Sequence, residues 1–332
     1  MSICNLVTGG AGFIGAHVVR ELLDLGEKVV ILDDLSGGFK ENIPEGVEFV
    51  EGSILDVTLV NNLFEKHKFT NVYHLAAYAA EGLSHFIRRF NYQNNLIGSI
   101  NLINASINHE IKCFIFTSSI AVYGANQLPM SEDMIPQPED PYGISKLAVE
   151  QDLKTANHMF GLDYVIFRPH NVYGEFQNIG DKYRNVIGIF MNQIMQDQPL
   201  TIFGDGTQSR AFSYVKEISQ TIALSAKNKD CFGEIFNVGA DTPYSVNDLA
   251  QEVGKLFGTK PKINYLDARN EVLHAYSTHA KVAKYFPNSP KFTLEEGLKK
   301  MADWAKEHGP RQSQEFGEIE VAKNLPPSWS KK

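Results

Sequence analysis

Short apolar runs alternate with longer amphipathic segments through the first half of the chain. The runs predict β-strands over residues 3–7, 28–32, 47–51, 72–74, 113–117 and 164–168. The segments between them predict helices near residues 14–25, 57–67, 91–109 and 143–160, because their apolar side chains recur at helical spacing. Regular alternation of strand and helix is typical of a parallel, doubly wound sheet with right-handed crossovers. We therefore predict an α/β fold.

The pattern changes after Gly174, where a polar stretch over residues 177–184 predicts a loop. The elements predicted beyond it are helices over 186–196, 219–227 and 246–257, the last capped by Ser245, and strands over 200–203, 212–215 and 235–238. The strict alternation of the first half is lost here, so we expect a second, smaller layer of mixed structure.

Composition narrows the class of protein. The 332 residues are 43% hydrophobic, enough for a full core, and the net charge is −8 without a long basic run. We therefore expect neither nucleic acid nor an anionic membrane as a partner. No stretch reaches the roughly 18 apolar residues of a membrane span. The first strand begins at once, so we expect no signal peptide and a reducing, cytoplasmic setting.

The cysteines and histidines of the sequence do not predict a metal site. Cys4, Cys113 and Cys231 are too few and too dispersed for a disulfide framework or a metal site. Cys4 and Cys113 stand in apolar runs, which predicts buried thiols. The histidines share no ligand spacing, so we expect no bound metal.

Three glycines follow the first predicted strand. Gly9, Gly12 and Gly15 belong to the sequence Thr8-Gly9-Gly10-Ala11-Gly12-Phe13-Ile14-Gly15, which a predicted helix follows. Glycines at this spacing permit a tight turn and let a pyrophosphate approach the free N–H groups of the helix N-terminus. The alternative is a glycine turn without a ligand. The strand before and the helix after favour a dinucleotide site.

Asp33 ends the second predicted strand, 18 residues after Gly15. A carboxylate at this position accepts hydrogen bonds from a ribose 2′-hydroxyl and repels a 2′-phosphate. The residues from Asp34 to Gly38 include no arginine, and Lys40 is the nearest cation along the chain. The sequence therefore predicts NAD rather than NADP as the cofactor.

These signals define the expected domains. A Rossmann-type NAD-binding domain is expected from residues 1–172 together with about 210–242, and a smaller mixed α/β domain that binds the substrate from residues 173–209 and 243–310. The remaining residues, 311–332, form a polar tail with Pro326-Pro327 and an isolated Trp329. We expect this tail to be disordered or wrapped on the surface.

Tyr142 and Lys146 lie four residues apart at the start of a predicted helix, and so on one of its faces. A lysine ammonium and an oxidised nicotinamide would together lower the pKa of the tyrosine toward neutrality and make it a general base. Ser119 follows the strand over 113–117, at the end where doubly wound sheets bind ligands. The alternative is two surface residues and a serine that caps the strand. The shared context favours a catalytic set of Ser119, Tyr142 and Lys146.

Taken in order, these motifs resemble the extended short-chain dehydrogenase/reductase family, most closely its nucleoside-diphosphate-sugar epimerases of the UDP-glucose 4-epimerase type. The resemblance rests on the glycine motif, on His74–Ala77, Asn95–Gly98, Ser118-Ser119 with Val122–Gly124, Tyr142 with Lys146, and Arg168–Gly174.

The resemblance implies a set of residues around the cofactor. Those expected to bind NAD are Gly9, Gly12, Phe13, Ile14, Gly15, Asp33, Asp34, Ser53, Ile54, Leu75, Ala76, Ala77, Asn95, Thr117, Tyr142, Lys146 and Pro169. Within this set, Lys146 is expected to bind the nicotinamide ribose and Asn95 to buttress the cleft. Ser53 departs from the usual aspartate of the family, so only a hydroxyl is offered to the adenine there.

The resemblance also implies a substrate site for a nucleoside-diphosphate sugar, most simply a UDP-sugar. The residues expected in it are Glu81, Ser118, Ser119, Asn171, Val186, Thr201, Phe203, Arg210 and Arg269. Arg269 is expected as a phosphate partner, although the arginine of the family aligns with Ala268. Residues 81–89 differ from a standard glucose epimerase and predict either a specificity element of this protein or a solvated loop. Ala275 falls where the family limits bulk at C2 of the sugar.

The implied activity is NAD-dependent epimerisation at C4 of UDP-glucose, UDP-galactose or a related sugar through a transient 4-keto intermediate. Ser118-Ser119 stand where related dehydratases carry Asp-Glu, which argues against dehydration. Two alternatives stay open: another oxidoreductase, decarboxylase or dehydratase of the family, and a non-catalytic NAD-binding regulator. We also expect a homodimer, because the family pairs the helices near 91–109 and 143–160 across a twofold axis.

Overall fold

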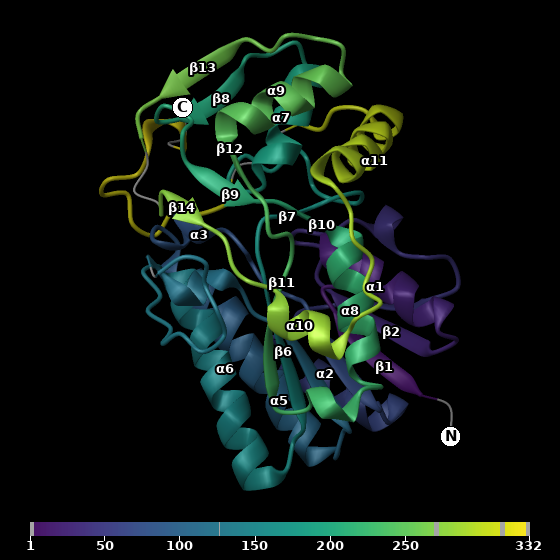
Figure 1. Cartoon of the computed structure of the whole chain (residues 1–332). Helices are drawn as coiled ribbons and strands as arrows, with labels where there is room; N and C mark the ends of the chain where they lie inside the picture. Colours follow the sequence, from purple (N-terminus) through teal and green to yellow (C-terminus); the bar gives the residue numbers. More distant parts are fainter. Residues whose placement is uncertain (1–2, 126, 269–271, 313–315, 330–332) are drawn as a thin grey trace.

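The computed structural model describes residues 3–125, 127–268, 272–312 and 316–329. Within these ranges a seven-stranded parallel sheet, ordered β11-β6-β5-β4-β1-β2-β3, forms the centre of the molecule (Figure 1). Its strands are β1 (Cys4–Thr8), β2 (Lys28–Asp33), β3 (Glu48–Glu51), β4 (Asn71–His74), β5 (Cys113–Thr117), β6 (Tyr164–Pro169) and β11 (Glu234–Val238). Each lies within one residue of its predicted range, and the predicted α/β, Rossmann-type fold is confirmed.

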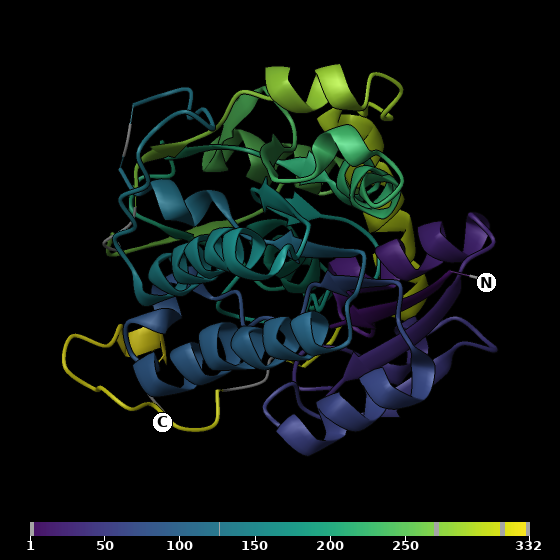
Figure 2. The same ribbon diagram turned by 90° about the horizontal axis from the view of Figure 1, so that it is seen from below.

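Helices cover both faces of this sheet. α1 (Phe13–Asp24) and α8 (Val215–Ser225) share one core with the strands, and α2 (Val57–His67), α5 (Gly98–Asn108) and α6 (Pro141–Phe160) share the other. Side chains of neighbouring residues alternate between the two, as Leu6 and Val7 do in β1. Figure 2 shows α5 and α6 side by side on the outside of their layer.

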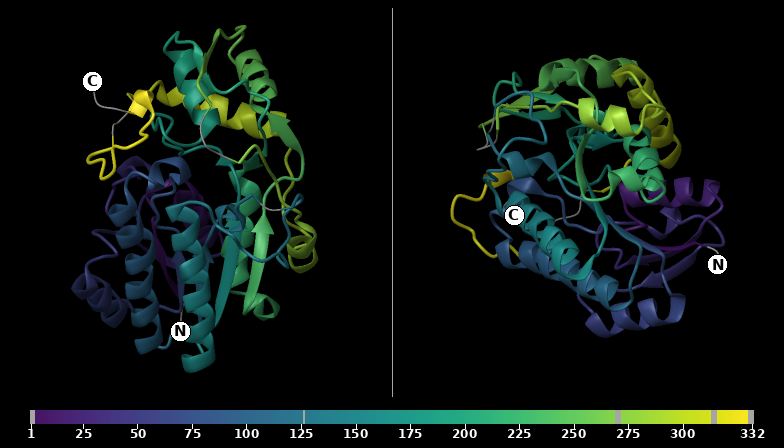
Figure 3. Two further views of the ribbon diagram at one scale, coloured as in Figure 1. Left: turned by 90° about the vertical axis from the view of Figure 1, so that its left-hand side faces the viewer. Right: turned by 60° about the horizontal axis from the view of Figure 1, so that its bottom comes forward.

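A smaller layer stands above the carboxyl ends of the sheet strands (Figures 1 and 3). It pairs β8 (Leu200–Phe203) with β13 (Ile263–Leu266), and β9 (Ser209–Ala211) with both β12 (Pro243–Ser245) and β14 (His274–Ala275). Its helices are α7 (Val186–Met195), α9 (Val246–Leu256) and α11 (Leu294–His308), while α10 (Ala280–Tyr285) packs on β11. The predicted cap of α9 is confirmed, because the Ser245 hydroxyl accepts a hydrogen bond from Asp248 N–H at 3.0 Å.

Three predicted elements differ from the structure. The helix predicted over 91–109 is α4 (Arg88–Tyr92), a π-helical turn over Gln93–Ile97 and then α5. The strand predicted over 212–215 is only β10 (Ser213–Tyr214), paired with β7 (Val172–Tyr173), and α8 begins at Val215 rather than near 219. Ile218 and Ile222 continue a helical stripe that starts at Val215 and lies in the core, which extends the helix toward its N-terminus.

The tail residues 316–329 wrap against α3 (Glu81–Ser84) and α4 (Figure 3, yellow). Trp329 is only 5% exposed and packs with Ala80, Leu83 and Ile87. Of the two expectations for the tail, wrapping on the surface therefore describes these residues and disorder does not. Trp329 is not isolated either, since its ring lies against those of Phe86 and Tyr183.

The described helices include none with the length and apolar character to cross a membrane. Cys4, Cys113 and Cys231 are buried free thiols, as the apolar runs around the first two predict.

Candidate active site

A pocket of about 1390 Å³ opens where the sheet meets the smaller layer. Residues at the carboxyl ends of β2, β5 and β6 line it, namely Asp33, Thr117 and Pro169. The volume exceeds the roughly 300–1,000 Å³ of a pocket for one small molecule. The pocket therefore has room for two ligands of that size, as a cofactor with its substrate requires.

The glycine loop forms one wall of this pocket because no side chain fits there. Gly9 has φ +72°, and a Cβ on it would lie 2.6 Å from the backbone nitrogen of Ala76. A Cβ on Gly15 would lie 2.0 Å from the carbonyl oxygen of Gly9. Gly12 is the N-cap of α1, and no side chain in the described ranges caps that helix. The N-terminus of α1 thus keeps its N–H groups for an anionic ligand.

Asp33 stands beside the loop at the end of β2. Its carboxylate accepts hydrogen bonds from Ala11 N–H at 3.0 Å and from Leu35 N–H at 2.8 Å. Burial raises the pKa of Asp33, and the two N–H groups oppose that shift. The side chain is therefore held rigidly at the position where the sequence predicts a ribose partner.

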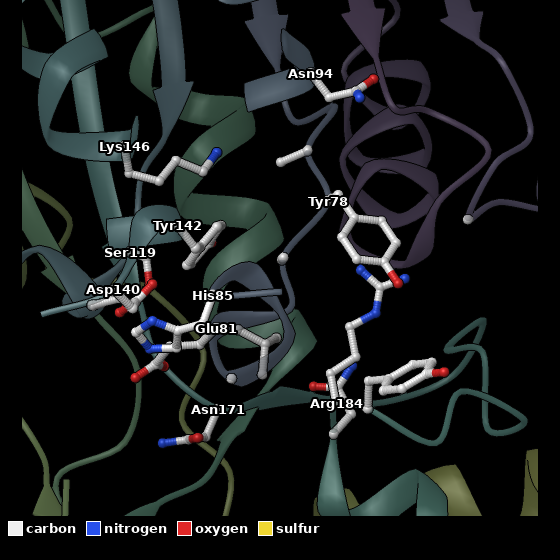
Figure 4. Close-up of a pocket in the computed structure, with 18 of the residues that line it drawn as sticks. Tyr78, Glu81, His85, Asn94, Ser119, Asp140, Tyr142, Lys146, Asn171 and Arg184 are labelled. Carbon is white, nitrogen blue, oxygen red and sulfur yellow. Dashed lines mark hydrogen bonds between the residues drawn. The ribbon is translucent and has the colours of Figure 1, made fainter. Parts of the chain in front are cut away.

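Tyr142, Lys146 and Ser119 lie together deeper in the pocket (Figure 4). Asp140 caps α6 by accepting a hydrogen bond from Gly143 N–H at 2.9 Å, and Pro141 opens the helix. This start places Tyr142 one turn before Lys146, with the Lys146 nitrogen 5.9 Å from the centre of the phenol ring. The same nitrogen donates a hydrogen bond to the carbonyl of Thr117 at 2.8 Å.

Burial dominates the electrostatics that the chain's own groups create at this site. Burial raises the pKa of Tyr142 well above its ordinary value, and a hydrogen bond with Ser119 opposes that shift. Burial also lowers the pKa of Lys146 to about 7, which the carboxylate of Glu150 opposes. Desolvation outweighs the Ser119 hydrogen bond and the charge of Arg184, which lower the pKa of Tyr142, and the lowering by Lys146 together with an oxidised nicotinamide stays a prediction.

The two adjacent serines face different ways. The Ser118 hydroxyl donates a hydrogen bond to the carboxylate of Glu150 at 2.5 Å, and that carboxylate also pairs with Arg168. Ser118 is therefore engaged by a buried ion pair rather than directed at a substrate. Ser119 faces the pocket and the Tyr142 phenol.

The predicted nucleotide residues surround a second pocket of about 340 Å³ next to the first. Val186 and Thr201 line only this pocket, whereas Asn171, Phe203 and Arg210 line both. Arg210 donates hydrogen bonds to the carbonyls of Ser209, Val272 and Leu273, which fixes its guanidinium at the junction of the two pockets.

Most of the predicted cofactor residues line the main pocket. They are Gly9, Gly12, Phe13, Ile14, Gly15, Asp33, Asp34, Ile54, Leu75, Ala76, Ala77, Thr117, Tyr142, Lys146 and Pro169, and of the substrate set Glu81 and Ser118 do so as well. Ser53 does not line it, and its hydroxyl accepts a hydrogen bond from Leu55 N–H at 3.2 Å. Asn95 is buried behind the pocket wall, where it bonds both N–H and C=O of Tyr78. Arg269 lies outside the described residues.

Several residues that line the pocket were not among those predicted: some adjoin predicted residues, and others come from distant loops and the tail. They include Tyr78, Asn94, Gln177, Arg184 and tail residues. The Arg184 guanidinium lies 4.9 Å from the centre of the Tyr78 ring, and its Nε donates to Asp181 at 2.6 Å. Its Nη2 is 3.4 Å from the position of a Cβ on Gly37, so the fold brings an arginine to the loop after Asp33. The contact between Arg184 and Gly37 cannot be predicted from the sequence, because the two residues lie far apart along the chain.

The residues present fit a dinucleotide. The N-terminus of α1 has no side-chain cap, and the glycine wall admits a ligand against the backbone. The buried Thr117 hydroxyl finds no hydrogen-bond partner among the described residues, although it faces the pocket. A buried polar group without a partner is costly, and a polar ligand at this wall relieves that cost.

Comparison with known proteins agrees with this site. The profile of the NAD dependent epimerase/dehydratase family matches residues 5–239. A putative UDP-glucose 4-epimerase of Methanocaldococcus jannaschii is 35% identical over 91% of this chain and 98% of its own length. The crystal structure of the Thermotoga maritima UDP-glucose 4-epimerase with UDP-glucose superposes with a TM-score of 0.88 at 34% identity, covering 92% of this chain and 99% of that one.

A third relative shows a cofactor together with a different sugar. The Bacillus cereus UDP-glucuronic acid 4-epimerase, solved with UDP-glucuronic acid and NAD, has a TM-score of 0.85 and 29% identity, covering 92% of this chain and all of that one. The fold, the NAD-compatible pocket and the extent of these matches lead to one conclusion. The chain belongs to the NAD-dependent epimerase/dehydratase family and is similar to enzymes that act on UDP-sugars.

Proposed function

We propose that this protein is a UDP-sugar 4-epimerase that interconverts UDP-glucose and UDP-galactose or a closely related pair. The observation that carries the proposal is that Tyr142 and Ser119 line the same pocket as the glycine wall and as Asn171 and Arg210, which also line the adjacent pocket. A sugar whose diphosphate lies near Asn171 and Arg210 has its ring directed toward this pair. Similarity to UDP-glucose 4-epimerases supports the choice of nucleotide and reaction.

The chemistry assigned to the chain is proton transfer. Tyr142 removes the proton of the C4 hydroxyl, Ser119 donates a hydrogen bond to the oxygen at C4, and Lys146 places a cation beside the phenol. A bound NAD, held by the glycine loop and Asp33, would supply the hydride acceptor and donor for C4. The 4-keto sugar then turns in the pocket so that the hydride returns to the opposite face of C4. Tyr142 gives the proton back to the C4 oxygen, which completes the epimer. Atoms and electrons balance within one sugar, so no second reactant is needed.

An uncharged sugar fits the charges of the pocket better than an acidic one. Arg184 lines the pocket with its guanidinium over the Tyr78 ring, but it already pairs with the carboxylate of Asp181. Glu81 and Asp140 also line the pocket near Tyr142, and both act to raise its pKa. A sugar carboxylate placed there would meet like charges. We therefore favour a hexose over a uronic acid, and with it epimerisation over decarboxylation.

The test is a panel of UDP-, dTDP- and GDP-sugars incubated with the purified protein, with the products identified by NMR. We expect C4 epimers of a UDP-hexose and no release of carbon dioxide or water. Tyr142→Phe should lower kcat by at least about 10²-fold, the scale of acid–base catalysis. The exposed Tyr265→Phe serves as a matched control and should keep full activity. Tyr142→Phe with full turnover would refute the role of Tyr142.

We further propose a homodimer joined through α5 and α6. Large apolar side chains are exposed on α6 and on the turn just before α5: Ile97 is 49%, Ile144 41%, Met159 67% and Phe160 64% exposed. Such residues are costly to leave in water and are typical of an interface. Light scattering should give a dimer mass at micromolar concentration for wild type and a lower mass for Ile144→Asp. A monomeric wild-type protein would contradict this proposal.

A further inference from the structure

The tail residues 316–329 contact residues 80–90 through both apolar side chains and backbone, and they also contact Tyr78 and Tyr183. Trp329 packs with Leu83 and Ile87 in an apolar cluster, and its ring lies 6.1 Å from that of Phe86. A Cβ on Gly82 would come within 3.3 Å of the Trp329 ring. The segment thus matches the shape of the tail closely.

Backbone and carboxylate contacts strengthen this attachment. The Glu320 carboxylate accepts hydrogen bonds from the N–H groups of Arg89 at 2.7 Å and Phe90 at 2.9 Å. In return the N–H groups of Glu320 and Val321 donate to the carbonyl of Phe86 at 2.9 and 3.1 Å. Glu320 therefore satisfies N–H groups at the start of α4 that the helix itself leaves without partners.

The segment held by the tail reaches the catalytic group. The Ser84 hydroxyl donates to the carbonyl of Glu81 at 2.6 Å and accepts from Tyr142 N–H at 3.3 Å. Its oxygen also lies 3.3 Å from the carboxylate of Asp140, the cap of α6. Glu81 and His85 of this segment line the pocket beside Tyr142 and Asp140 (Figure 4). A shift of residues 81–85 would therefore change the pocket where the sugar ring is expected.

The tail also lines the pocket directly. Val321, Lys323 and Leu325 border the main pocket, and Trp329 borders both this pocket and the adjacent one lined by Val186 and Thr201. Trp329 stands against Tyr183, with ring centres 5.3 Å apart, next to the paired Arg184. The tail thus borders the main pocket on the side formed by residues 81–86 and 183–184.

We propose that the C-terminal segment 316–329 is a specificity-determining part of the sugar site, which it borders with Trp329 and holds in shape by fixing residues 81–90. This inference rests on the proposed UDP-sugar substrate. It assigns sugar selection to contacts between the tail and residues 81–90, whereas the nucleotide is held by Asn171, Phe203 and Arg210. Loss of the tail contacts should therefore weaken binding of the sugar more than binding of the nucleotide.

The experiment compares Glu320→Ala and Trp329→Ala with Glu318→Ala, a matched control. Glu318 is an exposed glutamate of the same tail and does not line the pocket. Each full-length variant is titrated with UDP and with UDP-hexoses by calorimetry, and KM and kcat are measured for UDP-glucose, UDP-N-acetylglucosamine and UDP-glucuronic acid. The thermal midpoint of each variant monitors folding.

Trp329→Ala and Glu320→Ala should raise the KM for the preferred sugar at least about tenfold, the scale of a contact at a binding hot spot. The affinity of Glu320→Ala for UDP should change less than about threefold, because Glu320 lines neither pocket, and both variants should discriminate less among the three sugars. Glu318→Ala should match wild type. Unchanged KM and sugar preference in both folded variants would overturn the proposal, and so would higher activity, which would indicate a tail that obstructs the pocket.

The outcomes separate this inference from the proposed function. If wild type epimerises none of the sugars, the proposed function fails, and the calorimetric comparison of UDP with UDP-hexoses still tests the tail. Should Trp329→Ala unfold, Glu320→Ala carries the same test, because it removes one carboxylate and leaves the apolar cluster in place.

Discussion

The Ser118 hydroxyl donates a 2.5 Å hydrogen bond to the buried carboxylate of Glu150. This contact separates two serines that adjoin each other in the sequence. Glu150 also receives two hydrogen bonds from Arg168, so Ser118 completes a buried polar network that ties β5 and β6 to α6. Ser119 is left to face the pocket.

The two serines should therefore respond differently to substitution by alanine. Ser119→Ala should lower kcat by about 10²-fold, because it removes a donor to the oxygen at C4. It should also cost about 1 kcal/mol of stability, because the hydroxyl accepts a hydrogen bond from Ala121 N–H at 3.1 Å. Ser118→Ala should cost about 1–3 kcal/mol of stability and leave kcat within a few fold. Steady-state kinetics and thermal denaturation of both variants provide the check. The reverse pattern would exchange the roles assigned to the two residues.

The buried ammonium of Lys146 should lower the free energy of unfolding of the protein, although we assign it a role in catalysis. Burial lowers its pKa to about 7 from the ordinary 10.5, so the folded state binds this proton less well than the unfolded state. That cost is complete below pH 7 and is lost as the pH rises toward 10.5. Lys146→Met should consequently raise the thermal midpoint most at pH 7 and below, with kcat lower by at least about 10²-fold. Melting curves from pH 6 to about 10 would show whether the difference shrinks. A variant that melts lower than wild type at pH 6 would contradict this account.

Asp33 should disfavour the binding of NADP, and the fold places a second residue, Arg184, next to the same loop. We expect NAD to bind at least about tenfold more tightly than NADP, which corresponds to about 1.4 kcal/mol. Because Arg184 lies beside Gly37, Asp33→Asn should bring the two affinities together by admitting a phosphate near that guanidinium. Titration with both dinucleotides measures the ratio. Equal affinities in wild type would show that Asp33 does not discriminate.

Ala275 should admit bulk at C2 of the sugar. It lines the pocket and is buried, whereas the adjacent Tyr276 does not line it. Ala275→Tyr should lower kcat/KM for UDP-N-acetylglucosamine relative to UDP-glucose by at least about tenfold through steric exclusion. The ratio of the two kcat/KM values in wild type and variant is the measurement. An unchanged ratio would move sugar selection entirely to residues 81–90 and the tail.

The central sheet could be predicted from sequence because its strands are buried on both faces and read as continuous apolar runs. The smaller layer could be predicted only in part, since β9, β12 and β14 are two or three residues long and depend on pairing with distant partners. The π-helical turn over Gln93–Ile97 likewise has no periodic signature that separates it from α5. Local pattern fixes long elements, and tertiary contacts fix the short ones.

In the candidate site, too, residues within local motifs could be predicted and residues placed by tertiary contacts could not. Gly9, Asp33, Tyr142 and Lys146 were found because each belongs to a motif whose spacing has a physical reason. Arg184 and the tail were missed as pocket residues, since loops have no periodicity and the contacts of Trp329 with Leu83 and Phe86 span most of the chain. The effect of burial, which raises the pKa of Tyr142, has no signal in the sequence because burial is a property of the folded protein.

The most direct test of the proposed 4-epimerisation follows the hydrogen at C4. UDP-glucose carrying deuterium at C4 is incubated with the protein in ordinary water, and the UDP-galactose formed is examined by NMR and mass spectrometry. The account predicts that the product keeps its deuterium at C4, because the hydride leaves and returns within one pocket while only the hydroxyl proton passes through Tyr142. A C4 epimer that has lost its deuterium to solvent, or no C4 epimer at all, would contradict it.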